Sequence, residues 1–314
     1  MNFLIELPTW LGDTIMTTPA IENLVKNYKN SNFTFIGFNS SAEIFSNHPN
    51  TKKIYVLKRG YKHLYKNAKF LGEYDVFISF RNSIRSYFFS KLVRAKEKYH
   101  YSHKKYKAPH QVEKYNSFVS DSLGFKSLPD VLKIYSDDLD TCLNQNKKYI
   151  GINPGATYGS AKRWSPEKFA EVAKTFVEDY EILIFGTDSE TDFASSIENK
   201  LNDYGSKNIT NLSGKTSLSE LISIISKLDI FITGDSGPMH IAGAFNIPTV
   251  AIFGPTSEIE TCQWNTSLGK ILKTEIDCRP CKKRVCKFGH NNCMDLIQPD
   301  DVTEIAKKLL NYEV

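Results

Sequence analysis

The segment 230–257 constrains the fold most, because it combines two buried strands with a tight polar turn and a helix. Apolar runs at 230–233 and 249–253 predict two strands of one sheet. Between them, Gly-Asp-Ser-Gly-Pro predicts a sharp turn into a helix over 238–246, since Ser or Gly suits an N-cap and Pro is tolerated in the first helical turn. A strand, a helix and a second strand in this order are typical of a parallel α/β sheet.

The turn at 234–238 also predicts a binding site for an anion. Backbone N–H groups at the start of a helix, together with the helix dipole, attract phosphate at the carboxyl edge of an open α/β sheet. The alternative interpretation is an ordinary crossover whose polar residues only cap the helix. The candidate ligand contacts in or beside the turn are Asp235, Ser236, Gly237 and His240.

Strands and helices alternate along the rest of the chain and predict parallel sheets covered on both faces. In the first half we expect strands at 3–7, 33–38, 54–57 and 76–79 and helices at 14–29 and 83–91. In the second half we expect further strands at 149–153, 181–185 and 209–212 and helices at 166–179, 189–203 and 217–227.

A polar, turn-rich segment at 129–148 separates the two halves. The chain of 314 residues is long enough for two domains of about 150 residues each. We therefore expect an α/β protein with an N-terminal domain over 1–145, a C-terminal domain over 146–314 and a central cleft. An amphipathic helix from Pro299 ends the chain, with the option of packing back on the N-terminal domain.

Composition and charge narrow the class of protein. No apolar run reaches the ~18 residues needed to cross a bilayer, and Glu6 stands where a signal peptide would be basic, so a cytoplasmic protein is expected. The net charge of +5 suits phosphates, an anionic lipid surface or nucleic acid, but no nucleic-acid motif accompanies it. Positive charge concentrates at 94–114, which we interpret either as a solvated loop or as a contact for a phosphorylated or membrane-embedded acceptor.

The chain has six cysteines, and four of them follow the spacing C-x2-C-x4-C-x6-C within 278–293. Thiolates and imidazole suit tetrahedral zinc, but this spacing does not match the common zinc-finger patterns. Two interpretations stay open, a structural zinc site and a group of free or redox-labile thiols. The clustered residues are Cys278, Cys281, Cys286 and Cys293, with His290 among them.

Three predicted strand ends carry residues suited to catalysis or phosphate binding. Asp13 follows the first strand and could take a proton from a hydroxyl, while Gly12 would let a ligand approach the backbone. Lys162 and Arg163 follow a run of small and hydroxyl residues, as in a phosphate cradle. Glu190 could accept hydrogen bonds from ribose. The alternatives are helix caps for the two carboxylates and a basic surface loop for the two cations.

Three motifs occur in one order along the chain, PTWLGDTIMTTPAIENL, NPGATYGSAKRWSPEKFAEVA and GDSGPMHIAGAFNIPTVAIFGPTS. With them the chain resembles the ADP-heptose:lipopolysaccharide heptosyltransferases, glycosyltransferase family 9. The tail CRPCKKRVCKFGHNNCM, followed by a helix, is similar to that of many members of the heptosyltransferase II type. The resemblance implies a GT-B fold of two Rossmann-like domains, with the donor bound mainly by the C-terminal one.

The resemblance also implies the reaction and the role of single residues. Heptose would pass from ADP-heptose to the first heptose of the lipopolysaccharide or lipooligosaccharide inner core, with inversion and without a metal or other cofactor. Asp13 would be the general base, and Lys162 would neutralise the departing diphosphate. The donor contacts would be Thr157, Tyr158, Arg163, Glu190, Asp235, Ser236, Gly237 and His240, and the acceptor contacts Gly12, Arg81 and Arg85.

The partner implied is a lipid A–Kdo–heptose acceptor at the cytoplasmic face of the inner membrane, with peripheral association of the enzyme and no nucleic acid. Other functions stay open: a heptosyltransferase I acting on Kdo, a GT-B transferase for another nucleotide sugar, or a binding protein that kept the fold. A dinucleotide oxidoreductase is disfavoured, because the chain has neither G-x-G-x-x-G nor a P-loop.

Overall fold

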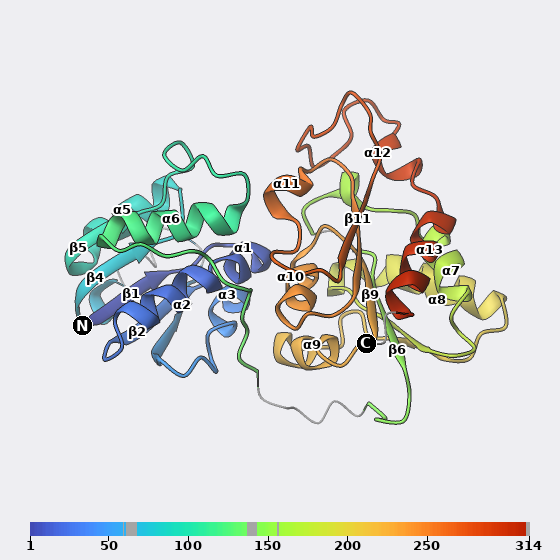
Figure 1. The fold of residues 1–314 in the computed structure, drawn as a ribbon, viewed down its shortest axis with the longest axis horizontal. Helices are drawn as coiled ribbons and strands as arrows, with labels where there is room; N and C mark the ends of the chain where they lie inside the picture. Colours follow the sequence, from blue (N-terminus) through green and yellow to red (C-terminus); the bar gives the residue numbers. More distant parts are fainter. Residues whose placement is uncertain (59, 61–67, 137–142, 156, 312–314) are drawn as a thin grey trace. The chain divides into compact units, whose positions relative to one another are not determined.

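The computed structural model describes residues 1–58, 60, 68–136, 143–155 and 157–311. The chain divides into two compact units, Met1–Asp137 and Asp138–Val314, coloured from blue to red along the sequence in Figure 1. The division lies within the turn-rich segment 129–148, whose residues 137–142 lie outside the described part. Each unit is built on its own parallel sheet.

The first unit has a five-stranded parallel sheet in the order β3-β2-β1-β4-β5. Phe3 stacks on Phe33 with ring centroids 5.0 Å apart, while its neighbour Leu4 belongs to a cluster with Phe77 and Phe89. Apolar side chains therefore cover both faces, as a parallel sheet between helices requires. The strands are β1 (Asn2–Glu6), β2 (Asn32–Gly37), β3 (Thr51–Val56), β4 (Glu73–Ser79) and β5 (Arg94–His100).

Strand β5 corrects the interpretation of residues 94–100 as part of a solvated loop. It pairs with β4 along its length and forms one edge of the sheet. Most of its side chains are exposed or half-buried, so the sequence RAKEKYH carries no apolar run that would predict a strand. Lysines on an edge strand also prevent further chains from pairing with it.

The helix expected at 14–29 is in fact two helices, α1 (Leu11–Met16) and α2 (Thr18–Asn27). The Thr17 hydroxyl donates to the Thr14 carbonyl at 2.6 Å, and Pro19 has no N–H to continue the helical ladder. Asp13 therefore lies in the first turn of α1. The other helices described in this unit are α3 (Asn39–Glu43), α5 (Ile84–Leu92), which packs on β5, and α6 (Gln111–Leu123), which packs on α2.

The second unit has a six-stranded parallel sheet in the order β11-β10-β9-β6-β7-β8. Its last strand, GKILK, was not predicted, because it is short and its residues are mostly exposed. The strands are β6 (Tyr149–Asn153), β7 (Glu181–Ile184), β8 (Ile209–Asn211), β9 (Ile230–Gly234), β10 (Thr249–Phe253) and β11 (Gly269–Lys273).

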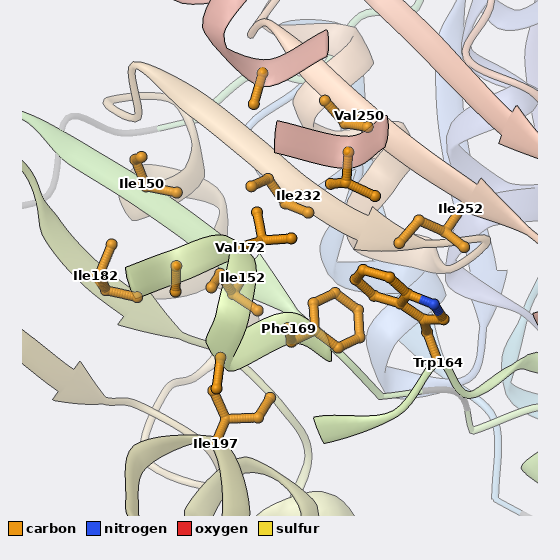
Figure 2. Close-up of a cluster of buried hydrophobic side chains, with 14 of the residues drawn as sticks. Ile150, Ile152, Trp164, Phe169, Val172, Ile182, Ile197, Ile232, Val250 and Ile252 are labelled. Atoms are coloured by element: carbon orange, nitrogen blue, oxygen red, sulfur yellow. The ribbon is translucent and has the colours of Figure 1, made fainter. Parts of the chain in front are cut away.

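One face of this sheet forms the core shown in Figure 2, where Ile152 and Ile232 face Phe169 and Trp164. The Trp164 indole donates to the Ile297 carbonyl at 3.1 Å, which satisfies its only polar atom inside the core. The helices are η1 (Ser160–Lys162), α7 (Pro166–Lys174), η2 (Asp188–Glu190), α8 (Thr191–Asp203), α9 (Leu218–Ile225), α10 (Gly237–Ala244), α11 (Glu258–Thr261), α12 (Asn292–Asp295) and α13 (Pro299–Leu310).

The last helix, α13, packs within the second unit. Val302, Ala306 and Leu309 are buried in the core shared with α7 and with strands β6, β7, β9 and β10. Among the described helices, none combines the length and the apolar character that a bilayer span requires.

Candidate functional site

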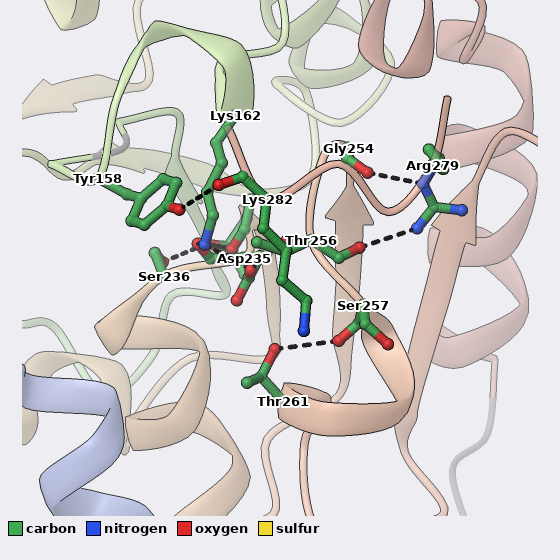
Figure 3. A network of polar contacts seen from close by, with 12 residues as sticks. Tyr158, Lys162, Asp235, Ser236, Gly254, Thr256, Ser257, Thr261, Arg279 and Lys282 are labelled. Atoms are coloured by element: carbon green, nitrogen blue, oxygen red, sulfur yellow. Dashed lines mark hydrogen bonds and ion pairs between the residues drawn. The ribbon is translucent and has the colours of Figure 1, made fainter. Parts of the chain in front are cut away.

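In the second unit, a buried ion pair lies where β9 ends and α10 begins. Lys162 Nζ lies 2.5 Å from Asp235 Oδ2 and also donates to the Asp235 carbonyl at 3.2 Å (Figure 3). The Thr256 hydroxyl donates to the same carboxylate oxygen at 2.6 Å. The side chains of Lys162 and Asp235 are only 10% and 7% exposed, so the ammonium is held in a fixed position. Two of its three N–H donors serve Asp235.

A second cation, Arg284, lies against the same aromatic ring as Lys162. The Lys162 ammonium lies 4.7 Å from the centre of the Tyr158 ring, and the Arg284 guanidinium lies 5.3 Å from it. The Tyr158 hydroxyl donates to the Lys282 carbonyl at 2.7 Å, which fixes the ring (Figure 3). Arg284 was missed by the sequence analysis, although it belongs to the basic run Lys-Lys-Arg between two cysteines.

The N-terminus of α10 has the geometry expected of an anion site. Ser236 is the N-cap residue and Pro238 lies in the first turn, as predicted. The Ser236 hydroxyl does not cap the helix; it accepts from Asn153 Nδ2 at 3.0 Å and lies 3.1 Å from the Thr233 hydroxyl. The first N–H groups of the helix are thus left for another acceptor. Gly237 begins this helix, and His240 is buried within it.

Glu190 presents a carboxylate oxygen beside the end of β6. Its Oε2 accepts from the Thr187 N–H and the Thr187 hydroxyl, both at 2.9 Å. Its Oε1 is buried and has no hydrogen-bond partner among the described residues. Gly155 comes so close that a Cβ there would lie 2.3 Å from the Glu190 carboxyl carbon. The helix-capping alternative is therefore correct for one oxygen only, and the other can accept from a ligand.

Two predicted donor residues, Arg163 and Thr157, lie outside the contacts described so far. The Arg163 guanidinium lies 5.8 Å from the centre of the Phe193 ring, on α8, whereas its neighbour Lys162 holds Asp235. Arg163 is thus turned away from the ion pair. Thr157 is exposed.

The cysteine-rich segment supports this site through the Arg279 side chain and the Arg284 backbone carbonyl. Arg279 donates to the Gly254 carbonyl at 2.6 Å and to the Thr256 carbonyl at 3.2 Å, and it pairs with Glu258 at 3.0 Å. The Ala161 N–H donates to the Arg284 carbonyl at 3.1 Å. These contacts position both Thr256 and the loop that carries Lys162. Nothing in the sequence distinguishes Arg279 from the other basic residues nearby, so it was not predicted as a site residue.

The four clustered cysteines line one small pocket together with Ala161, Arg279 and His290. Burial and the neighbouring cysteines raise the pKa of Cys293 to about 11, while backbone N–H donors lower the pKa of Cys286. Within the described ranges, no three His, Cys, Asp or Glu side chains are arranged to hold a metal ion. The structural zinc site and the group of free thiols therefore both stay as interpretations of this cluster.

In the first unit, Asp13 lies in the first turn of α1, directly after β1 and a short loop. Tyr115 is buried nearby. Its burial and the charge of Asp13 together raise the pKa of the Tyr115 phenol well above its usual value. Gln111 donates to the neighbouring Tyr101 hydroxyl at 3.0 Å. Gly12 is half-buried in the same helical turn.

Arg81 and Arg85 come together at the same edge of this sheet. Their guanidinium groups lie 5.2 and 5.6 Å from the centre of the Phe38 ring, and Arg85 donates to the Lys58 carbonyl at 3.0 Å. Glu6, at the end of β1, lies 3.6 Å from Arg81. Glu6 was not considered as a site residue, although an acidic residue in an otherwise apolar strand is a usable signal.

Glu6 is held by two serine hydroxyls as well as by Arg81. Ser79 donates to its carboxylate at 2.7 Å, and Ser86 donates to the same oxygen. Burial raises the pKa of Glu6 above its usual value, even though Arg81 and the two hydroxyls favour the charged form. Burial likewise lowers the pKa of Arg81.

Comparison with known proteins gives the family. The glycosyltransferase family 9 (heptosyltransferase) model matches residues 68–292. The chain is 37% identical over 318 residues to lipooligosaccharide heptosyltransferase 2 of Campylobacter jejuni serotype O:2, covering 99% of this chain and 98% of that one. It is 28% identical over 346 residues to lipooligosaccharide heptosyltransferase 2 of Haemophilus influenzae, covering 99% of both.

Solved structures confirm the GT-B fold. The E. coli ADP-heptose LPS heptosyltransferase II superposes with a TM-score of 0.83 at 23% identity, covering 100% of this chain and 99% of that one. A glycosyl transferase of family 9 from Veillonella parvula gives 0.88 at 22%, with coverages of 99% and 97%. E. coli heptosyltransferase WaaC, solved with ADP, gives 0.77 at 16%, with coverages of 98% and 100%.

These findings confirm the predictions of an enzyme, of a glycosyltransferase and of the heptosyltransferase II resemblance. The family model covers well over half of the chain, and a full-length relative shares more than a third of its residues. The chain belongs to glycosyltransferase family 9, the heptosyltransferases.

Proposed function

We propose that this chain transfers L-glycero-D-manno-heptose from ADP-heptose to the first heptose of a lipopolysaccharide or lipooligosaccharide inner core. The observation that carries the proposal is the 37% identity, along the whole chain, with a lipooligosaccharide heptosyltransferase 2. The donor is proposed because related structures were solved with ADP and with ADP-2-deoxy-2-fluoro heptose. The reaction inverts the anomeric carbon.

The donor is held by the carboxyl edge of the second unit. Lys162 keeps one N–H for the diphosphate, because Asp235 takes the other two. The uncapped N–H groups of α10 point their partial positive charge at the same phosphates. Both are in place before the bond to ADP breaks, so the growing negative charge is stabilised without reorganisation. The remaining proposed donor contacts are Thr157, Tyr158, Arg163, Ser236, Gly237 and His240.

Glu190 binds the ribose of the donor. Its Oε2 is already used by Thr187, and its buried Oε1 accepts a hydrogen bond from a ribose hydroxyl. An unmet buried acceptor is costly, so binding the nucleotide removes this cost and adds affinity. No resident metal or other cofactor takes part in the proposal.

The acceptor is activated by the first unit. Asp13 takes the proton of the attacking hydroxyl of the acceptor heptose. The oxygen of that hydroxyl bonds to the anomeric carbon of the donor heptose, and the bond from that carbon to ADP breaks. Gly12 lets the acceptor approach the backbone. Arg81 and Arg85 bind the anionic groups of a phosphorylated core, since Arg pairs well with phosphate and carboxylate. The acceptor, lipid A–Kdo–heptose, lies at the cytoplasmic face of the inner membrane, where the enzyme associates peripherally.

One assay tests the proposal. ADP-heptose is incubated with core acceptors that carry zero, one or two heptoses, and the products are weighed by mass spectrometry. We expect a gain of one heptose on the acceptor with one heptose. A product from the acceptor without heptose identifies a heptosyltransferase I instead. Transfer from UDP- or GDP-sugars in place of ADP-heptose identifies a different donor, and acceptor binding without release of ADP identifies a binding protein.

A further inference from the structure

Helix α5 has its large apolar side chains on the outside. Ile84, Tyr87, Phe88 and Leu92 are 75%, 54%, 55% and 40% exposed. Their spacing of three, four and eight residues from Ile84 places them on one side of the helix. The opposite side of the helix is buried, and its Phe89 belongs to the core of the first unit together with the following Val93. An exposed apolar stripe of this kind marks an interaction surface.

A neighbouring segment covers the same face of the sheet and also exposes an aromatic side chain. Ala68 and Leu71 belong to the same buried cluster as Phe89 and Val93, so residues 68–71 cover the same face of the sheet as α5. Phe70, within that segment, is 66% exposed.

The charges on the helix itself are positive. The sequence of α5, IRSYFFSKL, contains an Arg and a Lys and no acidic residue. The Lys91 ammonium lies 5.0 Å from the centre of the Tyr87 ring, within the stripe itself. Lys98 of β5 donates to the Ser90 carbonyl at 2.9 Å, which brings a further cation against the helix.

We propose that the outer face of α5, made of Ile84, Tyr87, Phe88, Lys91 and Leu92, docks on the surface of a bilayer that contains anionic phospholipid. Apolar side chains with aromatic rings enter the boundary between head groups and acyl chains, and the flanking cations meet anionic head groups. A protein partner would more often offer a matched acidic rim. The two serines of α5, Ser86 and Ser90, are buried, so its cations and Tyr87 are the hydrogen-bonding side chains that its outer face offers to such an interface.

This docking surface deepens the proposed function, in which the enzyme associates peripherally with the membrane, by naming the residues that contact the bilayer. It stands on exposure and charge alone and does not depend on which sugar is transferred. Under the proposed function it has a further consequence, since Arg85, a proposed acceptor contact, lies in the first turn of the same helix. A lipid-linked acceptor would then be met at the surface where its lipid is anchored.

The test is co-sedimentation of the full chain with vesicles. Vesicles of phosphatidylethanolamine and phosphatidylglycerol are compared with vesicles of phosphatidylcholine, at low and high salt. We expect binding to the anionic vesicles that weakens with salt, because the Debye length falls from about 10 Å at 0.1 M to about 3 Å at 1 M. The variant Ile84→Ser/Phe88→Ser is expected to lose at least tenfold in vesicle affinity.

The matched control removes two apolar side chains that are equally exposed elsewhere. Leu128 and Val285 are 87% and 68% exposed, and Leu128→Ser/Val285→Ser is expected to bind vesicles like the unchanged chain. Thermal unfolding of both variants checks the fold. Wild-type binding of the α5 variant, or equal binding of the unchanged chain to both kinds of vesicle, overturns the proposal. A dimer in sedimentation equilibrium that the α5 variant turns into monomer also overturns it, because the occupant is then a second copy.

An activity measurement separates this proposal from the proposed function. With a water-soluble deacylated acceptor, the α5 variant should transfer heptose at the unchanged rate. With the acceptor embedded in vesicles, its KM should rise at least tenfold. If no acceptor accepts heptose from any variant, the proposed function fails while the vesicle result still decides the docking surface.

Discussion

At the scale of single residues, Asp13 carries the base in the proposed reaction. Asp13 lies in the first turn of α1, directly after the first strand of the sheet. We expect Asp13→Asn to lower turnover by at least about 100-fold, the lower range for a positioned general base. Calorimetry should show unchanged affinity for ADP-heptose. Asp121→Asn, an exposed change in the same unit, is the control, and near-normal turnover of Asp13→Asn contradicts the assignment.

Lys162 is expected to contribute to both stability and donor binding. Lys162→Ala leaves the Asp235 carboxylate buried without its ion pair, and removing one partner of such a pair costs about 3–5 kcal/mol. The double variant Lys162→Ala/Asp235→Asn removes the unpaired charge, so part of the stability should return in chemical denaturation. Donor affinity should stay at least tenfold low in both. Recovery of donor affinity in the double variant would show that Lys162 has a structural role only.

Cys286 and Cys293 should differ in reactivity. Backbone N–H groups lower the pKa of Cys286, whereas burial raises that of Cys293 to about 11. At pH 8 a larger fraction of Cys286 is therefore thiolate, and thiolate is the form that alkylates. Iodoacetamide should label Cys286 at least about ten times faster than Cys293, as measured by peptide mass spectrometry. In urea the rates should converge, and equal rates in the folded protein would contradict the prediction.

At the scale of elements, the sequence was sufficient wherever a strand is apolar and buried. Strands β6 and β9 were predicted almost to the residue, because every side chain in them is buried. The edge strands β5 and β11 were missed, since exposure removes the apolar run that predicts a strand. The break between α1 and α2 was missed too, because Pro19 suits the first turn of a helix as well as the end of the preceding one.

The candidate site was only partly readable from the sequence for a similar reason. A residue type at a strand end indicates what it can bind, so Asp235, Lys162 and Glu190 could be proposed. Their partners come from distant segments, and only the fold brings Thr256 to the carboxylate of Asp235. The role of Arg279 could not be predicted, because it binds backbone carbonyls and no pattern of side chains in the sequence indicates such contacts.

The close contact between Gly155, just after β6, and Glu190 of η2 gives a prediction at this scale. Gly155→Ala places a Cβ 2.3 Å from the Glu190 carboxyl carbon, so Glu190 has to move. Loss of its hydrogen bond to ribose should raise the KM for ADP-heptose about tenfold, since one hydrogen bond contributes about 1 kcal/mol or more. Asn202→Ala, an exposed change on α8 of the same unit, is the control. An unchanged KM in Gly155→Ala would exclude Glu190 from donor binding.

At the scale of the whole molecule, each of the two units has its own parallel sheet and its own share of the proposed chemistry. The residues proposed for the donor all lie between 155 and 240, in the second unit, while Asp13, Arg81 and Arg85 belong to the first. Parallel sheets place their strand ends at one edge, so each unit can hold its ligand on a rigid frame. Binding of the donor should therefore stabilise mainly the second unit.

Hydrogen exchange with and without ADP tests this division. A ligand present at one hundred times its Kd stabilises the state that binds it by about 2.7 kcal/mol. Amides at 153–163, 186–190 and 234–240 should exchange up to about 100-fold more slowly with ADP, because they exchange only when the donor site opens. Peptides of the first unit should change far less. In Lys162→Ala the protection should fall to about tenfold or less at the same ADP concentration, whereas Asp13→Asn should keep it. Protection confined to residues 1–136 would place the nucleotide on the other unit and reverse the assignment of donor and acceptor.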